Sequence, residues 1–168
     1  MRVSNKMKSM KKKSKRILKA KFIRPSQIHT YDDAKRALRM ISEGKRRIEQ
    51  SGYEAILTQL FQKYIRMQGD CVLREVKKPW TDGGLISAGH VFSRNVKELK
   101  WDERNCYPQC MSCNSMHRTY PTIFHDWARA KLGDEEYNKI KEIATSKQVF
   151  IISYEDVMNL IKKYNEQI

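Results

Sequence analysis

Two cysteines three positions apart, Cys110 and Cys113 in "QCMSCN", restrict this chain more than any other feature. A Cys-x-x-Cys pair can occupy two of the four tetrahedral positions around Zn²⁺ across one tight turn. Cys71 offers a third thiol, but Arg74 stands where a second pair would be completed. The alternative is that no metal binds and the thiols are small core residues. The candidates for a fourth ligand are Cys106, His117 and His125.

The cellular compartment decides how these thiols are interpreted. The first residues are basic, but no apolar segment typical of a secretory signal follows them. No apolar run approaches the roughly 20 residues that a membrane span needs. We therefore expect an intracellular protein with no membrane association. Disulfides are rare inside cells, so closely spaced thiols favour a metal site.

Charge indicates the class of partner. The chain has 168 residues, with 34 Lys and Arg against 19 Asp and Glu, for a formal net charge of +15. Such an excess favours a polyanionic partner. Helices that bind anionic lipid need a strong apolar face, which the basic N-terminus lacks. Nucleic acid is therefore the expected partner.

The length favours one domain with appendages. We expect a basic, flexible tail over residues 1–30, a basic helix over 31–52, and the main domain over 53–168. Lys and Arg side chains on these parts are predicted to contact phosphates independently of sequence. They are Lys11, Lys12, Lys13, Lys15, Arg16, Arg39, Lys45, Arg46, Arg47, Arg94 and Arg118.

Periodicity and capping residues predict a mainly helical α+β protein. Helices are expected from about Asp32 with Thr30 as N-cap, over 53–68, from Cys110 or Met111, over 124–132, over 134–144, and from Ser153 to the C-terminal end. Turn residues at 82–84 predict a hairpin between the segments on either side, with His90 in its second strand. Asn105 is expected in the loop that follows.

Three polar residues around the cysteines could cleave a phosphodiester. Such cleavage needs a base that activates water and a divalent cation that offsets charge on the phosphate. His90 would be the base, Asn105 would orient the imidazole or tie the loop, and Asn114 would offer an oxygen to Mg²⁺. Each has a plainer interpretation, because a strand His is often a surface residue, and an Asn often marks a turn or a helix N-cap.

The order His, Asn, Cys-x-x-Cys-Asn resembles that of the HNH, or ββα-metal, nucleases. The words "YIRMQGDC", "AGH", "LKWDERN", "QCMSCN" and "ARAKLG" make the resemblance closest to the phage NinG/Rap recombination proteins, from about Leu57 to the C-terminal helix. The pair Cys113-Asn114 is also similar to endonuclease VII, a phage Holliday-junction resolvase.

The resemblance implies a small ββα-metal core with a structural zinc and an endonuclease that uses Mg²⁺ or Mn²⁺. Its substrates would be branched recombination intermediates, namely Holliday junctions, D-loops and flaps, in the host cytoplasm if a phage encodes the chain. The resemblance also implies that His90 is the general base, Asn105 the middle Asn and Asn114 a metal ligand. Cys71, Cys110 and Cys113 carry over as zinc ligands. Resolvases are often dimers, so a homodimer is an option, although the sequence shows no dimer signature.

Two departures from the family pattern concern metal binding. Arg74 stands in the place of an expected Cys. Related sites hold a carboxylate or His just before the base, and the NinG-like pattern holds it three positions before, where this chain has Ser87. The catalytic metal would then rely on His117, on a more distant acid such as Asp82, or on substrate phosphates and water. The alternatives are a non-catalytic DNA-binding protein on this scaffold, and a free-standing homing or nicking endonuclease.

Overall fold

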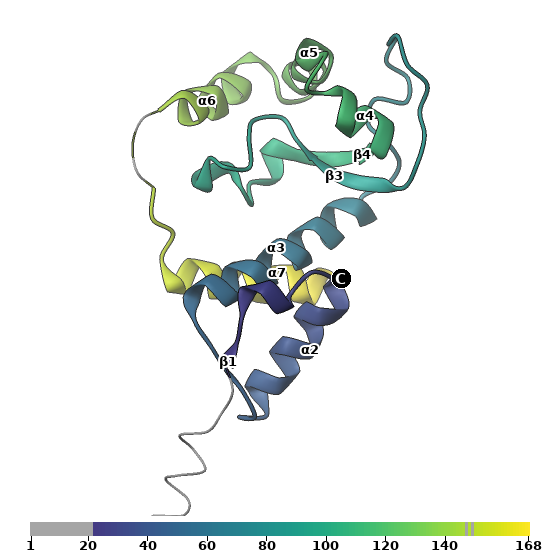
Figure 1. Cartoon of the computed structure of the whole chain (residues 1–168). Helices are drawn as coiled ribbons and strands as arrows, with labels where there is room; N and C mark the ends of the chain where they lie inside the picture. Colours follow the sequence, from purple (N-terminus) through teal and green to yellow (C-terminus); the bar gives the residue numbers. More distant parts are fainter. Residues whose placement is uncertain (1–21, 147, 149) are drawn as a thin grey trace, which may run out of the picture. The chain divides into compact units, whose positions relative to one another are not determined.

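The computed structural model describes residues 22–146, 148 and 150–168, and it divides the chain into two compact units (Figure 1). The first unit ends at Gln59, and the second is Leu60–Ile168. The division therefore falls within a helix, a few residues after the boundary at 52/53 that we expected. The expectation for the tail up to residue 21 lies outside the described residues. The chain is a mainly helical α+β protein with small sheets.

The first unit is built around one helix. Strand β1 (Phe22–Ile23) pairs in parallel with β2 (Arg47–Ile48), and the short helix η1 (Pro25–Gln27) leads to α2 (Tyr31–Ser42). The predicted N-cap is confirmed, because Thr30 Oγ1 accepts a hydrogen bond from the Asp33 N–H at 3.1 Å. The buried stripe of α2 is made by small residues, Ala34 and Ala37, rather than by the larger aliphatic residues of this helix.

Helix α3 (Gln50–Met67) confirms the second predicted helix. Leu60, Phe61 and Ile65 recur at helical spacing and are fully buried, which assigns this stripe to the core. The helix ends before Gly69, whose φ of 134° suits glycine and few other residues. The chain then turns into the loop that carries Cys71.

The sheet of the second unit corrects the predicted hairpin. Strand β3 (Ile86–His90) pairs antiparallel with β4 (Cys106–Cys110), with Ile86 opposite Cys110 and His90 opposite Cys106. The segment before the turn at 82–84 forms no strand in the described chain. The partner strand instead lies in the stretch that we expected to be loop, because pairing to β3 overrides the weak strand signal of "CYPQC".

Two short helices, η2 (Lys97–Leu99) and η3 (Glu103–Asn105), lie between β3 and β4. After β4 come α4 (Met111–Met116), α5 (Pro121–Leu132), α6 (Asp134–Thr145) and α7 (Tyr154–Gln167), which confirms the predicted helices to within three residues. The predicted cap of α7 is also confirmed, since Ser153 Oγ accepts from the Asp156 N–H at 3.0 Å. The apolar segment before it forms no strand in its described part.

Each face of the hairpin has its own partner. On one face the Tyr107 ring contacts Phe124 and Trp127 of α5, with ring centroids 6.3 and 4.8 Å away. On the other face His90 lies against Phe61 of α3, at 6.4 Å. The C-terminal helix α7 packs on the same side as Phe61 through Tyr164, whose ring lies 5.3 Å from that of Phe61. Burial on both faces fixes the register, because a slip by one residue would exchange them.

The carboxamide of Asn105 closes the connection between the two strands. Its Oδ1 accepts from the Phe92 N–H at 2.8 Å, and its Nδ2 donates to the carbonyls of Phe92 and Leu99, both at 3.1 Å. The backbone carbonyl of Asn105 accepts from the Val91 N–H at 2.8 Å. The side chain is fully buried, so these bonds replace water for every group involved.

Replacing Asn105 with Ala should therefore lower the free energy of unfolding by about 2–4 kcal/mol, since three backbone groups would lose their buried partner. Urea denaturation followed by circular dichroism measures this. Asn95→Ala, at an exposed position of the same connection, is the matched control and should stay within about 0.5 kcal/mol of the parent. Equal costs for the two variants would contradict the role assigned to Asn105.

Candidate functional site

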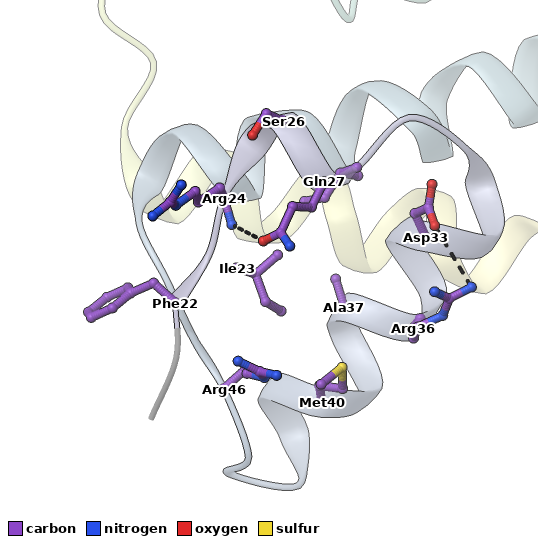
Figure 2. Close-up of a pocket in the computed structure, with 11 residues that line it drawn as sticks. Phe22, Ile23, Arg24, Ser26, Gln27, Asp33, Arg36, Ala37, Met40 and Arg46 are labelled. Atoms are coloured by element: carbon purple, nitrogen blue, oxygen red, sulfur yellow. Dashed lines mark hydrogen bonds and ion pairs between the residues drawn. The ribbon is translucent and has the colours of Figure 1, made fainter. Parts of the chain in front are cut away.

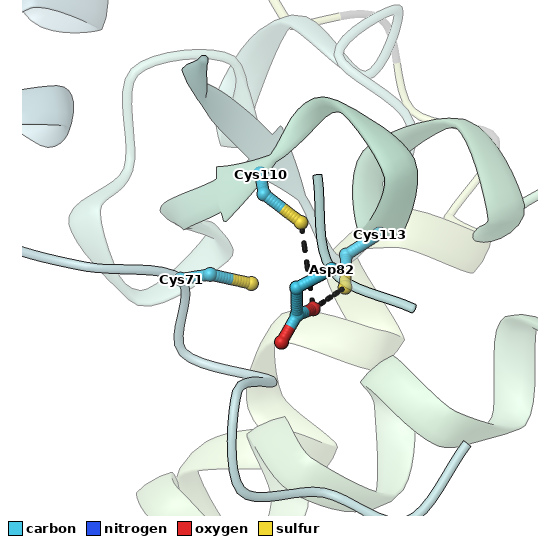
Figure 3. A group of neighbouring side chains, drawn as sticks. All are labelled: Cys71, Asp82, Cys110 and Cys113. Atoms are coloured by element: carbon cyan, nitrogen blue, oxygen red, sulfur yellow. Dashed lines mark hydrogen bonds between the residues drawn. The ribbon is translucent and has the colours of Figure 1, made fainter. Parts of the chain in front are cut away.

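Three thiols and one carboxylate gather at the start of α4. One ligand atom from each of Cys71, Asp82, Cys110 and Cys113 lies within 4.8 Å of every other (Figure 3). The three cysteines that we predicted as ligands are thus brought together. Asp82 is the one member of this group that we did not predict as a zinc ligand.

Three backbone connections build this group. Cys110 ends β4 and Cys113 lies one turn into α4, so the strand-to-helix transition sets their spacing. Cys71 is docked by the Val72 N–H, which donates to the Pro108 carbonyl of β4 at 2.9 Å. The turn with Asp82 is held to α4 by two bonds, from the Met111 N–H to the Leu85 carbonyl at 3.1 Å and from the Ser112 N–H to the Gly83 carbonyl at 3.2 Å.

Hydrogen bonds within the group order its protons. The Cys113 thiol donates to Asp82 Oδ1 at 3.0 Å and the Cys110 thiol donates to the same atom at 3.5 Å. The bond from Cys113 is the main reason that the pKa of Asp82 lies below its usual value. Burial, followed by the contact with this carboxylate, raises the pKa of the Cys113 thiol. In the protein without a bound cation, Asp82 is therefore the anion and Cys113 keeps its proton.

Two neighbouring side chains, Trp80 and Lys78, favour deprotonated ligands in this group and therefore the binding of a cation. Trp80 Nε1 donates to Cys113 Sγ at 3.4 Å, a bond that supports a thiolate and orients it. Lys78, with a side chain only 5% exposed, forms an ion pair with Asp82 at 3.2 Å. Three thiolates and a carboxylate around a divalent cation carry net negative charge, and the ammonium group offsets part of it.

The donor set fits a metal ion. Sulfur ligands with one carboxylate oxygen in a tetrahedral arrangement are typical of zinc, whereas Mg²⁺ and Ca²⁺ take oxygen ligands. All three thiols are buried, so bound metal would serve structure rather than open chemistry. The ion would tie the loop after α3, the turn at 82–84 and the start of α4 into one body.

The other candidates for the fourth ligand lie elsewhere. Cys106 stands at the opposite end of β4 from Cys110 and is paired with His90, so the structure does not bring this possible zinc ligand to the other three thiols, whereas Asp82 lies beside them. His125 Nδ1 lies 2.9 Å from the Tyr137 hydroxyl. Arg74, which replaces the expected Cys, is exposed and forms an ion pair with Asp70 at 2.9 Å.

His90 and Asn105 meet at the far end of the hairpin. His90 Nε2 lies 3.0 Å from the Lys100 carbonyl, which identifies Nε2 as the protonated nitrogen. Nδ1 lies 3.7 Å from Cys106 Sγ. The backbone carbonyl of Asn105 accepts a hydrogen bond from the N–H of Val91, the residue that follows His90. Asn105 therefore positions the connection around His90 rather than the imidazole itself.

The protonation of this pair follows from burial. Desolvation lowers the pKa of His90, and the nearby cations Arg94 and Lys100 lower it further, against the opposing effect of the Lys100 carbonyl. The imidazole is therefore neutral at pH 7, with Nδ1 able to accept a proton. Burial raises the pKa of the Cys106 thiol, so Cys106 stays protonated and faces that nitrogen.

Asn114 lies in a different environment from His90. It lines an open groove beside β3 and α4 that also includes Ser87, and His90 is not among the lining residues. The pleat directs Ser87 and His90 to opposite faces of the strand. The structure thus places Asn114 in the same groove as Ser87, which stands three positions before His90. The His90 imidazole does not line that groove.

Gln109 fills the space beside Gly89, the residue directly before His90. A Cβ on Gly89 would meet Gln109 Oε1 at 1.9 Å. The Gln109 side chain is fully buried, and its Oε1 and Nε2 have no hydrogen-bond partner. The space that a carboxylate at 89 would enter is therefore filled by this carboxamide.

His117, a candidate second ligand for Mg²⁺, follows α4 and is half-buried between rings. Its ring centroid lies 5.2 Å from that of Phe124 and 5.6 Å from that of His125. Its Nδ1 is buried without a hydrogen-bond partner, and burial lowers its pKa. It does not line the groove of Asn114, so the structure does not place these two candidate ligands together.

The predicted DNA-binding cations are spread over both units. Lys11, Lys12, Lys13, Lys15 and Arg16 lie outside the described residues, whereas Arg39, Lys45, Arg47, Arg94 and Arg118 are exposed. Arg46 lines a groove of about 930 Å³ in the first unit, where Arg24 and Arg36 flank the apolar side chains of Ile23, Ala37 and Met40 (Figure 2). The groove also contains Asp33, which pairs with Arg36 at 3.8 Å.

Comparison of the chain with family models, with curated proteins and with solved structures found no match. None of the helices in the described part is both long and apolar enough to cross a bilayer.

If Asp82 is a metal ligand, Asp82→Ala should weaken zinc binding by at least about tenfold, because one anionic donor is lost. Competition with a chromogenic chelator, together with the metal content of the purified protein, measures this. Asp82→Cys restores four anionic donors and should keep or raise the affinity. Asp126→Ala, which removes an exposed carboxylate from α5, is the control, and equal affinities for Asp82→Ala and Asp126→Ala would exclude Asp82 from the site.

Proposed function

We propose that this chain is a metal-dependent DNA endonuclease of the HNH type, related to the NinG/Rap recombination proteins. The observation that carries the proposal is the order of parts around one hairpin. β3 ends at His90, Asn105 closes the connection to β4, β4 ends at Cys110, and α4 carries Cys113 and Asn114. This is the order expected of a ββα-metal core.

A structural Zn²⁺ held by Cys71, Asp82, Cys110 and Cys113 completes that core. Its ligands include both ends of the strand-to-helix transition that carries Asn114. Fixing this transition fixes the backbone from which the Asn114 carboxamide projects. The zinc in this proposal therefore acts on geometry and does not touch substrate.

In cleavage, His90 is the general base. Its Nε2–H is held by the Lys100 carbonyl, so Nδ1 takes the proton of the attacking water while the phosphorus–oxygen bond to the leaving strand breaks. The low pKa of His90 keeps Nδ1 free of a proton at neutral pH. Mg²⁺ or Mn²⁺ at the Asn114 oxygen would supply charge neutralisation. Because the groove of Asn114 does not include His90, cleavage by this route requires the scissile phosphate to span the two.

Charge and the absence of base-reading motifs support a branched DNA substrate. A net charge of +15 favours phosphate contacts, which position a duplex without reading its sequence. Recognition by shape and deformability then remains as the source of selectivity. Four-way junctions, D-loops and flaps are the substrates that we propose.

The second candidate function is a non-catalytic DNA-binding protein on the same scaffold. It is favoured by Ser87 in the groove of Asn114 and by Gln109 filling the space over Gly89, since neither offers a carboxylate to Mg²⁺. The Cys106 thiol facing His90 Nδ1 also favours it, because this nitrogen must be free to act as a base.

His90→Ala should abolish cleavage of a Holliday junction or flap in Mg²⁺ or Mn²⁺ and leave DNA binding almost unchanged, because the base is lost while the cationic surface remains. Gel assays of cleavage beside fluorescence anisotropy in EDTA measure the two properties. His125→Ala, at another half-buried His, is the control and should still cut. Cleavage by His90→Ala at the parental rate would show that another group is the base, and equal cutting of linear duplex would point to a homing or nicking enzyme.

Ser87→Asp tests the second candidate, because it places a carboxylate in the groove beside Asn114. For an enzyme with an incomplete metal site, this variant should lower the Mg²⁺ concentration for half-maximal cleavage by about tenfold. Ser115→Asp puts the same charge in the same groove from α4 and controls for charge alone. If neither the parent nor Ser87→Asp cuts branched DNA in Mg²⁺ or Mn²⁺, the non-catalytic function is the correct one.

A further inference from the structure

The groove that contains Asn114 has a lining with a distinct chemistry. It lies within the second unit, has a volume of about 670 Å³ and opens between the end of α3, β3 and α4. Two guanidinium groups, two hydroxyls, one carboxamide and three apolar side chains line it, and no carboxylate does. These residues are Arg66, Leu85, Ile86, Ser87, Met111, Asn114, Ser115 and Arg118.

The two arginines of the groove differ from three others of the second unit, which are paired with carboxylates. Arg74, Arg104 and Arg129 each form an ion pair with a carboxylate. Within the described chain, Arg66 and Arg118 form none. Arg66 is also half-buried, and desolvation lowers the pKa of its guanidinium. Holding a cation partly out of water without a protein anion is costly, so the groove favours an anionic ligand.

Two exposed apolar side chains lie beside these cations. Leu85 is 81% exposed and Met111 is 58% exposed. They are held together by the bond from the Met111 N–H to the Leu85 carbonyl, and Gly84, with a φ of 78°, allows the close approach of this backbone to Met111. Apolar side chains beside two guanidinium groups complement a ligand in which anionic and apolar parts alternate. A nucleic-acid strand is such a ligand, because phosphates alternate with sugars and bases.

We propose that this groove seats one strand of the nucleic acid, with Arg66 and Arg118 on its phosphates and Leu85 and Met111 against its sugars or unstacked bases. Arg66 is the new element, because its place near the end of a helix with a buried apolar stripe gives no sign of such a role. The contacts are independent of base identity. This inference rests on the proposed function for its choice of ligand, but it concerns binding alone.

The test measures affinity for a four-way DNA junction by fluorescence anisotropy in EDTA, where no cleavage occurs. Arg66→Ala and Arg118→Ala should each weaken binding by about threefold to tenfold, and each should lower the slope of log affinity against log salt by about one. Arg74→Ala, which removes an equal charge from a paired, exposed position in the same unit, is the control and should leave both quantities unchanged.

Leu85→Ser and Met111→Ser separate the apolar contacts from the ionic ones. They should weaken binding by a similar factor without changing the salt slope, because no phosphate contact is lost. Circular dichroism checks each fold. If Arg66→Ala does not fold, Arg66→Gln, which keeps most of the aliphatic stem, becomes the deciding variant.

The outcomes distinguish the groove from the proposed function. If both arginine variants bind the junction as the parent does, the groove proposal is overturned, whether or not the parent cuts. If they bind weakly while the parent never cuts, the groove stands and the endonuclease does not. Vesicles containing phosphatidylserine form the last arm, and losses of affinity confined to the vesicles would assign the groove to lipid headgroups instead.

Discussion

The second unit depends on one buried carboxamide. Asn105 satisfies a backbone N–H and two carbonyls of the connection between β3 and β4, so a long excursion returns to the sheet with a fixed register. That register sets His90 opposite Cys106 and Ile86 opposite Cys110. The carboxamide thus supports the pairing that sets the neighbours of His90, because a small two-stranded sheet has little pairing energy of its own.

The candidate metal-binding group supports one end of this hairpin, and the C-terminal helix supports the other. Cys71 and Asp82 reach the start of α4 from loops that contain no strand. On the other side, Glu103 accepts hydrogen bonds from Tyr64 and Tyr164 and pairs with Lys163, which joins α3, η3 and α7. These contacts thus stabilise a two-stranded hairpin that would be only marginally stable by itself.

The sequence predicts helices and cysteines here better than it predicts the sheet. Helix caps are local, so Thr30 and Ser153 could be identified from a few neighbours. The spacing of Cys110 and Cys113 likewise carries its meaning within one turn. Strand β4 could not be predicted, because "CYPQC" contains a proline and becomes a strand only when β3 pairs with it. Asp82 was missed for a similar reason, since its position depends on backbone bonds from residues of α4, and its turn in "TDGG" was the only signal.

Gly89 and Gln109 illustrate how packing links two positions across the hairpin. Any Cβ at 89 excludes the present conformation of the carboxamide at 109, so a side chain at 89 requires this carboxamide to move or to be shortened. A homologue with an acid before its histidine should therefore carry a shorter residue at the position of Gln109. Joint variation at these two positions would distinguish sequences that bind a catalytic cation through strand β3 from sequences that, like this one, have closed that position.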